Sequence, residues 1–278
     1  MSDKPAWPSV LALTVALAVF SAGCARTTSA VRSYPAPTAD ELMAALKARQ
    51  GAVRTLNAET RATSWLGGER VRGTVQMLAV RGGQLRFEAE VTLQGTVAAL
   101  AVDKGRFTFI DYQKHVFRQG PACPANVAGL IRIPLAPAAV AAILLGDAPL
   151  QDATKAVRVE WDAARAADVL VLEDPSGTTL WLGMHKPDAT AAAWDVLFLE
   201  GAGAGAKQRW RVSYEELSRD GGMALPRLVR FAEPGKGFDD GVEIKIRDRQ
   251  INGALSDEAF VLQRPPGYPI ELASCGPA

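Results

Sequence analysis

The sequence lacks the residues that transition-metal sites and nucleic-acid-binding surfaces require. Its 278 residues include only two histidines and three cysteines, which leaves little from which to build a metal site. The 31 lysines and arginines almost balance the 30 aspartates and glutamates, so the formal net charge is +1. Nucleic-acid binding needs a concentrated basic surface, and this balance argues against it. Hydrophobic residues make up 48% of the chain, which excludes wholesale disorder.

Catalytic and nucleotide-binding motifs are also missing. The sequence has no Gly-x-Ser-x-Gly elbow of a hydrolase. Residues 201–207 match the Gly-x-Gly-x-x-Ala spacing of a dinucleotide-binding loop, but the alternating residues 209–214 predict a strand where that motif needs a helix N-terminus. A P-loop would need glycine in place of Ala206. His115 and His185 fall in separate predicted strands without an acidic partner motif. We therefore expect neither an enzyme nor a cofactor-binding protein.

An uncharged apolar run near the N-terminus is too short to cross a bilayer. It covers residues 10–20, whereas a transmembrane helix takes roughly 20 residues. Small residues at 21–23 and then Cys24 follow it, which is typical of a secretory signal, whereas a buried core helix would rarely stand at the extreme N-terminus. The ending resembles the lipobox of bacterial lipoproteins. This resemblance implies that residues 1–23 are a signal peptide and that Cys24 becomes the acylated, palmitate-bearing N-terminus.

The same resemblance implies a location. Ala25 follows the cysteine, where well-studied enteric bacteria use aspartate to retain lipoproteins at the inner membrane. It therefore implies a lipid-anchored protein on the periplasmic face of the outer membrane. Residues 24–37 lack apolar periodicity, so we interpret them as a lipidated tether before a domain at 38–278. We expect this domain to be monomeric.

The two remaining cysteines form a candidate pair. Export would place Cys123 and Cys275 in an oxidising compartment, where an even number of cysteines usually pairs. A disulfide between them would join the C-terminal tail to the middle of the chain. Two unpaired thiols are the alternative, because the sequence does not reveal the distance between them.

Hydrophobic periodicity divides the domain into elements. Thr38 and Glu41 form a capping box before an amphipathic helix of about 15 residues, with Arg49 placed outside its apolar stripe. From Leu56 the period becomes two, and the short connections predict an antiparallel meander, with a hairpin turn at residues 81–84. A second series of strands runs from about residue 155 to residue 249.

An apolar insert separates the two series of strands. It covers about residues 125–147 and contains a predicted helix at 137–145, with proline at its start and glycine just past its end. Because this helix is apolar on every side, it must be covered on more than one face.

This order of elements resembles the superfamily of the lipoprotein carriers LolA and LolB, and an uncharacterised lipoprotein family within it. The stretch Phe260 to Gly267 is similar to the closing Phe-x-x-x-x-Pro-x-Gly pattern of that superfamily. The resemblance implies a mainly β fold, a single half-open antiparallel β-barrel of about 11–13 strands with an N-terminal helix and a helical lid or plug. In that superfamily LolB bears an exposed apolar residue on a hairpin loop, which the tight turn at 81–84 does not offer.

The apolar face of the predicted sheet supplies the candidate ligand site. Its large inward residues could line a cavity or simply fill a solid core, and periodicity does not distinguish the two. The candidate cavity residues are Phe87, Phe109, Trp161, Trp194, Trp210 and Ile244, and the candidate lid residues are Val140, Ile143 and Leu144. We expect a non-enzymatic envelope lipoprotein that binds a lipid or acylated partner. The alternative is a structural adaptor with a solid core that docks an envelope protein complex or a glycan.

Overall fold

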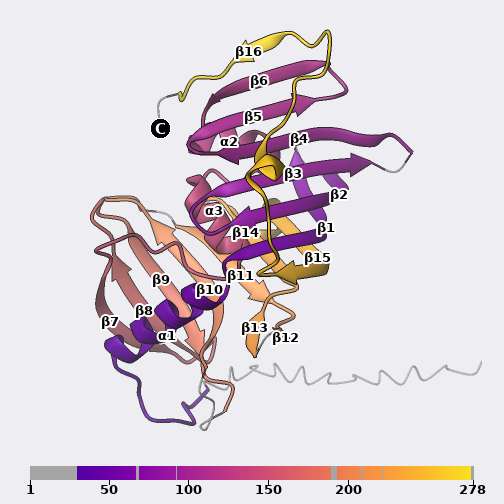
Figure 1. Cartoon of the computed structure of the whole chain (residues 1–278). Coiled ribbons are helices and arrows are strands. Elements are labelled where there is room, and N and C mark those ends of the chain that lie inside the picture. The colour runs from indigo at the N-terminus through magenta and orange to yellow at the C-terminus, as the bar shows by residue number, and fades with distance from the viewer. Residues whose placement is uncertain are drawn as a thin grey trace, which may run out of the picture.

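The computed structural model describes residues 30–66, 69–91, 93–188, 193–207, 209–220 and 222–276. The predicted signal peptide and Cys24 lie outside the described residues. One large sheet with fourteen strands dominates the molecule, and three helices lie on its inner side (Figure 1). None of the helices in these ranges is long and apolar enough to cross a membrane.

The first half of the sheet is an antiparallel meander, as its short predicted turns require. Gly82 and Gly83 take φ values of 108° and 107° in the turn between its second and third strands, which only glycine adopts readily. The six strands are β1 (Thr55–Leu66), β2 (Glu69–Val80), β3 (Gln84–Val91), β4 (Gly95–Asp103), β5 (Arg106–Asp111) and β6 (Val116–Pro121).

The second half is also antiparallel, and it returns to the first. Its last strand pairs with β1, so the two halves form one continuous sheet. The strands are β7 (Lys155–Asp162), β8 (Ala167–Glu173), β9 (Thr179–His185), β10 (Asp195–Ala202), β11 (Trp210–Glu215), β14 (Leu228–Ala232) and β15 (Val242–Ile251), with β12 (Ser218–Asp220) and β13 (Met223–Leu225) in a separate small ladder. The strand β11 follows the glycine-rich loop, as the alternating residues 209–214 predict.

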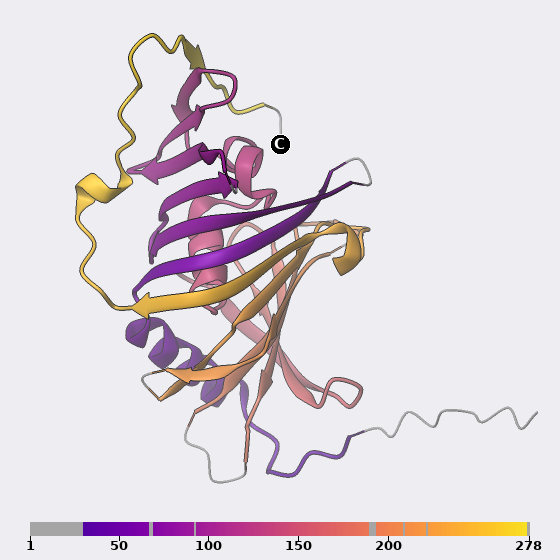
Figure 2. The ribbon, with the colours of Figure 1, turned by 90° about the vertical axis from the view of Figure 1, so that its right-hand side faces the viewer.

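The predicted barrel is not confirmed, because the sheet does not close. Its order is β16-β6-β5-β4-β3-β2-β1-β15-β14-β11-β10-β9-β8-β7, which leaves β16 (Ile270–Leu272) and β7 at the edges. The sheet instead twists and curls around the helices (Figure 2). The strand number also exceeds the expected 11–13, since β12, β13 and β16 are three-residue strands that carry no clear alternation.

The N-terminal helix α1 (Ala39–Ala52) begins at the predicted capping box, in which the Glu41 N–H donates to the Thr38 hydroxyl. Leu42 and Leu46 are fully buried, as the apolar stripe predicts. Arg49 is buried too, which corrects its predicted exterior position. Its guanidinium donates to the carbonyl oxygens of Gly146 (2.9 Å) and Ala224 (2.7 Å), so carbonyl groups that are distant in sequence draw it inward.

The insert forms two short helices, α2 (Pro124–Ile131) and α3 (Pro137–Leu144). The predicted helix at 137–145 is therefore confirmed to within one residue. Val140, Ile143 and Leu144 are buried in the main apolar core, and α3 contacts β2 and β3. Contact on all sides accounts for a helix without a polar face.

A C-terminal strap completes the fold. After β15 it crosses β3 and β4 through the 3-10 turn η2 (Asp257–Phe260), and β16 then pairs in parallel with β6 (Figure 2). Cys275 forms a disulfide with Cys123, as predicted, with the two Cα atoms 6.0 Å apart and a sequence separation of 152. Since Cys123 is the N-cap residue of α2, the disulfide ties that helix to the strap.

Candidate functional site

An apolar cavity of about 290 Å³ lies beneath α2, on the inner face of the first half of the sheet. It occupies the ends of the strands near the β1–β2 and β3–β4 turns. Most of its wall comes from β1 to β4, with further residues from β15 and from the end of α2. The lining residues include Ala62, Ser64, Val71, Gly73, Val75, Met77, Phe87, Ala89, Ala98, Ile131 and Ile244.

A change in side-chain size along the strands creates this cavity. Phe87 stands between Met77 and Leu100 in one cross-strand row, and these large side chains fill the space above the sheet. Two residues further along β3, Ala89 stands between Val75 and Ala98. Residues two apart share a face of the sheet, so the small side chains leave room where the preceding row has none.

Small residues also form the row nearest the turns. Ala62 of β1 stands opposite Gly73 of β2, and both line the cavity. Val71 and Val91 at its mouth are 49% and 38% exposed. Leu93, in the β3–β4 turn beside them, is fully exposed. Apolar residues are therefore exposed near the mouth, while the charged residues Arg72, Glu90 and Arg132 also line the cavity.

The cover of the cavity is α2 rather than α3. Gly129, Ile131 and Arg132 line the cavity, and no residue of α3 does. Arg132 ends α2 in a left-handed conformation with φ 59°, and the buried Ile133 follows it. The predicted lid residues Val140, Ile143 and Leu144 lie in the packed core instead.

Of the six predicted cavity residues, the structure brings two to the site. Phe87 and Ile244 line the cavity. Phe109, Trp194 and Trp210 are half-buried against other parts of the core. Trp161 lies at the edge of the second half, where its indole N–H donates to the Ala30 carbonyl oxygen (3.1 Å).

The sequence interpretation missed the small residues Ala62, Gly73, Ala89 and Ala98. It searched for large inward aromatic residues, whereas the space comes from the inward positions where large residues stop. The signal was present in β3, where Leu85 and Phe87 give way to Ala89 at the same period.

The cavity wall has little that could perform chemistry. Among the described residues, no group of three or more His, Cys, Asp and Glu side chains could hold a metal ion. Neither histidine lines the cavity, since His115 stacks edge-on against Tyr268 and His185 Nδ1 lies 3.1 Å from the Ala166 carbonyl oxygen. An apolar pocket with few polar groups suits binding of an apolar ligand better than catalysis.

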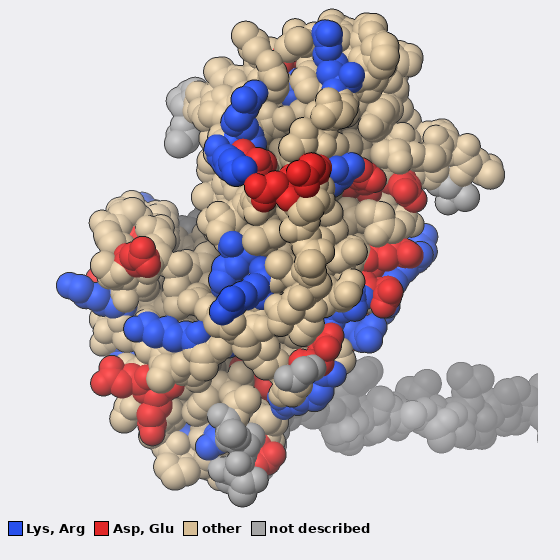
Figure 3. Space-filling view, viewed as in Figure 1, with Lys and Arg blue, Asp and Glu red and all other residues tan. Residues whose placement is uncertain are grey.

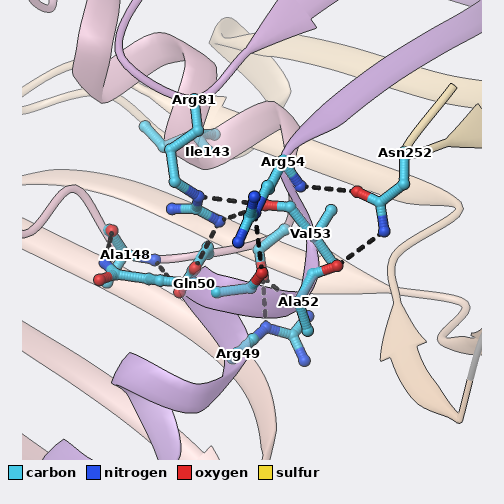
Figure 4. A network of polar contacts seen from close by, with 12 residues as sticks. Arg49, Gln50, Ala52, Val53, Arg54, Arg81, Ile143, Ala148 and Asn252 are labelled. Carbon is cyan, nitrogen blue, oxygen red and sulfur yellow. Dashed lines mark hydrogen bonds and ion pairs between the residues drawn. The ribbon is translucent and has the colours of Figure 1, made fainter. Parts of the chain in front are cut away.

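A buried polar cluster behind α3 is structural (Figure 4). Arg81, from the β2–β3 turn, donates to Asp147 (3.0 Å) and to the Val53 carbonyl oxygen (2.8 Å). The Tyr214 hydroxyl donates to the carbonyl oxygen of Asp147 (2.9 Å). Burial raises the pKa of Asp147, and the charge of Arg81 opposes that rise. Burial likewise raises the pKa of Tyr214 and lowers the pKa of Arg49. These bonds join α1, the insert and both halves of the sheet.

The outer face of the second half carries arginines stacked on aromatic rings. The Phe198 ring lies against Gly183, where a Cβ atom would stand 2.0 Å from it. The Arg165 guanidinium lies 3.8 Å from the centre of that ring, and it also donates to Glu200 (2.8 Å). The Arg209 guanidinium lies 3.4 Å from the centre of the Trp181 ring and donates to the same carboxylate (2.9 Å).

These hydrogen bonds determine the pKa of Glu200. Burial alone would raise it, but the bonds from Arg165 and Arg209 outweigh burial and lower it. On the face drawn in Figure 3, basic and acidic side chains are likewise interspersed, which agrees with the balanced charge of the chain.

No protein-family model matches the sequence, and no curated protein matches it in sequence. Solved structures do match in fold. A putative outer membrane lipoprotein-sorting protein domain from Vibrio parahaemolyticus has a TM-score of 0.55 at 12% identity, over 80% of this chain and 95% of that one. A LolA superfamily protein from Nitrosomonas europaea has a TM-score of 0.54 at 14% identity, over 82% and 99%. A DUF1329 family protein from Desulfovibrio piger has a TM-score of 0.56 at 10% identity, over 80% and 95%.

These similarities extend over most of this chain and almost the whole of each matched chain. At such low identity they show the fold alone. The fold is similar to that of these three proteins, one of which is a LolA superfamily protein, as the order of elements predicted.

Proposed function

We propose that this protein is a non-enzymatic envelope lipoprotein that binds a lipid or acylated partner in the cavity beneath α2. The observation that carries the proposal is the cavity itself, since small inward residues leave about 290 Å³ of mainly apolar space. This volume lies near the lower end of ligand sites, which span roughly 300–1,000 Å³. It suits one acyl chain or part of one. The LolA-like fold supports the same class of ligand.

Burial of methylene groups would supply the affinity. Each buried CH₂ contributes about 0.8 kcal/mol, so shortening a bound chain by two carbons should weaken binding roughly 15-fold. A steep dependence on chain length, ending where the chain exceeds the cavity, is the expected signature.

Uptake and release require the cover to move. We infer that α2 moves and that α3 does not, because residues 140–144 of α3 are all buried. The disulfide at Cys123 holds the N-terminus of α2, so movement would be greatest at its other end, near Ile131 and Arg132.

The anchor belongs to the same proposal. Cys24 would carry the lipid and hold the protein at the periplasmic face of the outer membrane, and the domain would act as a monomer. Cys24→Ser should release the protein from membranes. If the Cys24→Ser protein still fractionates with membranes after a carbonate wash, the anchor is wrongly assigned.

The outer arginine–aromatic face favours one alternative. Arginine and aromatic residues are the ones most enriched at binding hot spots, so this face could dock an envelope protein complex or a glycan. In that case the cavity would have no ligand, and the protein would be an adaptor.

A fluorescent fatty-acid titration of the soluble domain separates the two functions. Ala62→Phe should fill the cavity and reduce uptake at least tenfold. The matched control is Arg61→Phe, at the neighbouring exposed position on the opposite face of β1, which should leave uptake unchanged. Wild-type protein that takes up no fatty acid, and that releases no lipid on organic extraction, would exclude the carrier function.

A further inference from the structure

Residues 30–34 are not a free tether, because they are fastened to the end of the second half of the sheet. The Ala30 N–H donates to the Ala163 carbonyl oxygen (2.9 Å), and the Ala30 carbonyl oxygen accepts from Trp161. The Arg32 guanidinium lies 4.8 Å from the centre of the Trp161 ring. The first residues of the described chain are therefore packed against the domain.

A buried carboxylate forms the centre of this attachment. Asp168 is fully buried, and each of its oxygens accepts one hydrogen bond, from Arg32 (2.6 Å) and from the Tyr34 hydroxyl (3.0 Å). Tyr34 is buried as well, and Trp194 packs edge-on against it at 5.5 Å. Burial and the bond to Asp168 raise the pKa of Tyr34. We call Arg32, Tyr34 and Asp168 the tether clamp.

The pairing of Asp168 explains why the clamp should hold. Asp168 lies on the same face of β8 as the core residues Leu170 and Leu172. A carboxylate buried without a partner costs several kcal/mol, so releasing Arg32 and Tyr34 requires hydration of the end of the core. Asp168 is more than 130 positions away from Arg32 and Tyr34 in sequence, and only the fold brings it to them.

The clamp and the cavity lie at opposite ends of the strands. Neighbouring strands are antiparallel, so turns alternate between the two ends of the strands. The β7–β8 turn lies at the same strand ends as the β2–β3 turn, whereas the cavity lies toward the β1–β2 and β3–β4 turns at the other ends. In Figures 1 and 2 the described chain starts at the lower end of the molecule, and α2 with β1 to β4 occupies the upper half.

The clamp shortens the reach of the anchor. From Cys24 to Thr38, where α1 begins, the chain has fourteen steps and could extend about 50 Å. From Cys24 to the fastened Ala30 it has six steps and extends at most about 20 Å. A free segment of fourteen steps would let any face of the domain meet the membrane. A free segment of six steps keeps the β7–β8 end of the domain beside the membrane.

We propose that the tether clamp orients the lipoprotein with its β7–β8 end on the anchoring bilayer and the cavity mouth turned away from it. This inference rests on the proposed function, since it takes Cys24 as the lipid anchor. In this orientation an acyl chain enters the cavity from the periplasmic side. It does not enter directly from the anchoring membrane.

Energy transfer on vesicles tests the orientation with the full acylated chain. A donor dye is attached at Ala164→Cys in the exposed β7–β8 turn, or at Gln113→Cys, whose side chain hydrogen-bonds to Gln94 of the β3–β4 turn. The acceptor is a dye on the headgroup of a vesicle lipid. We expect transfer from position 164 to be at least threefold more efficient than from position 113.

Opening the clamp should remove that difference. Arg32→Ala with Tyr34→Ala should bring the two transfer efficiencies together, and Asp168→Asn should act in the same direction. Trypsin should also cut after Arg32 at least tenfold faster in the Asp168→Asn protein. Arg158→Ala, which removes an exposed ion pair on β7 outside the clamp, should change none of these readouts.

Equal transfer from both positions in the wild type, or stronger transfer from position 113, would overturn the orientation. A full-length chain that does not associate with vesicles at all would overturn both the anchor and the orientation. Failure of the soluble domain to take up fatty acid would contradict only the carrier function, because the transfer experiment contains no cargo.

Discussion

The two halves of the sheet have the same alternation of inward and outward residues, but they differ in the size of the inward side chains. In the second half the inward positions hold large residues such as Leu170, Leu182 and Met184, which are buried in the core. In the first half the inward positions change from Phe87 to Ala89, and a cavity opens under α2. Large inward side chains fill the inner face of the second half, whereas the first half contains the cavity. Alternation sets which side chains face inward, but their size decides whether the interior is filled.

The largest expected effect comes from placing a charge in each of the two insert helices, α3 and α2. Leu144→Asp in α3 puts an unpaired carboxylate into packed apolar surroundings, which should cost about 4 kcal/mol or more and unfold the domain. Ile131→Asp in α2 faces the cavity at a half-buried position and should remain folded while losing fatty-acid uptake. Thermal melts paired with the binding titration measure both. Equal destabilisation by the two changes would mean that α2 is as much a part of the core as α3.

Removal of the disulfide should have the next largest effect, and it concerns the first half of the sheet, which contains the cavity. Cys123→Ser with Cys275→Ser should lower the free energy of unfolding by about 2–4 kcal/mol, because a closed loop of 152 residues restricts the unfolded chain. It should also speed fatty-acid exchange, since α2 loses its fixed end. Denaturant unfolding and stopped-flow displacement give the two quantities. Unchanged exchange in the double variant would show that the strap does not restrain the cover.

Two glycines compare the packing of the halves directly. Gly183→Ala would push a Cβ atom into the Phe198 ring and should cost about 1–3 kcal/mol. Gly129→Ala in α2 meets no atom within 4 Å and should stabilise the helix by up to about 1 kcal/mol. Urea midpoints of the two variants should therefore move in opposite directions. A loss of stability in both would contradict the open packing around α2.

The smallest expected effect concerns acid stability of the outer arginine–aromatic face. The folded pKa of Glu200 lies below its ordinary value of 4.5, so its stabilising contribution is present above that value and is lost as the pH falls through the folded pKa. Glu200→Gln removes this contribution, which should be about 1 kcal/mol or less at neutral pH. The wild type and the variant should therefore converge in stability as the pH drops below 4.5. A constant difference between their melting temperatures from pH 7 to pH 3 would contradict this.

Much of the fold follows from local signals in the sequence. The capping box at Thr38 and Glu41 determines where α1 begins, because both partners lie within one turn. Period-two alternation with short turns predicts the antiparallel strands, and the proline and glycine around residues 137–146 delimit α3. The pairing of Cys123 with Cys275 was also anticipated, since only two cysteines remain after the lipobox.

The cavity followed less well from the sequence. Phe87 and Ile244 line it, whereas Trp161, Trp194, Phe109 and Trp210 lie in other surroundings. A large aromatic side chain in a strand predicts that the position is buried, but it does not indicate which residues pack around it. Ala89 and Ala98 matter only because pairing sets them side by side, which no single strand reveals.

By itself the sequence determined the face that each residue presents, because the periods of helix and strand follow from backbone geometry within a few residues. It also determined the caps, the turns and the cysteine pair available for bonding. Only the tertiary structure decided which faces meet. The pairing of β15 with β1 makes one sheet of two halves, carbonyl groups distant in sequence bury Arg49, and Asp168 fastens Arg32 and Tyr34. These contacts join residues roughly a hundred positions or more apart, and their stability depends on the whole packed core rather than on any local preference.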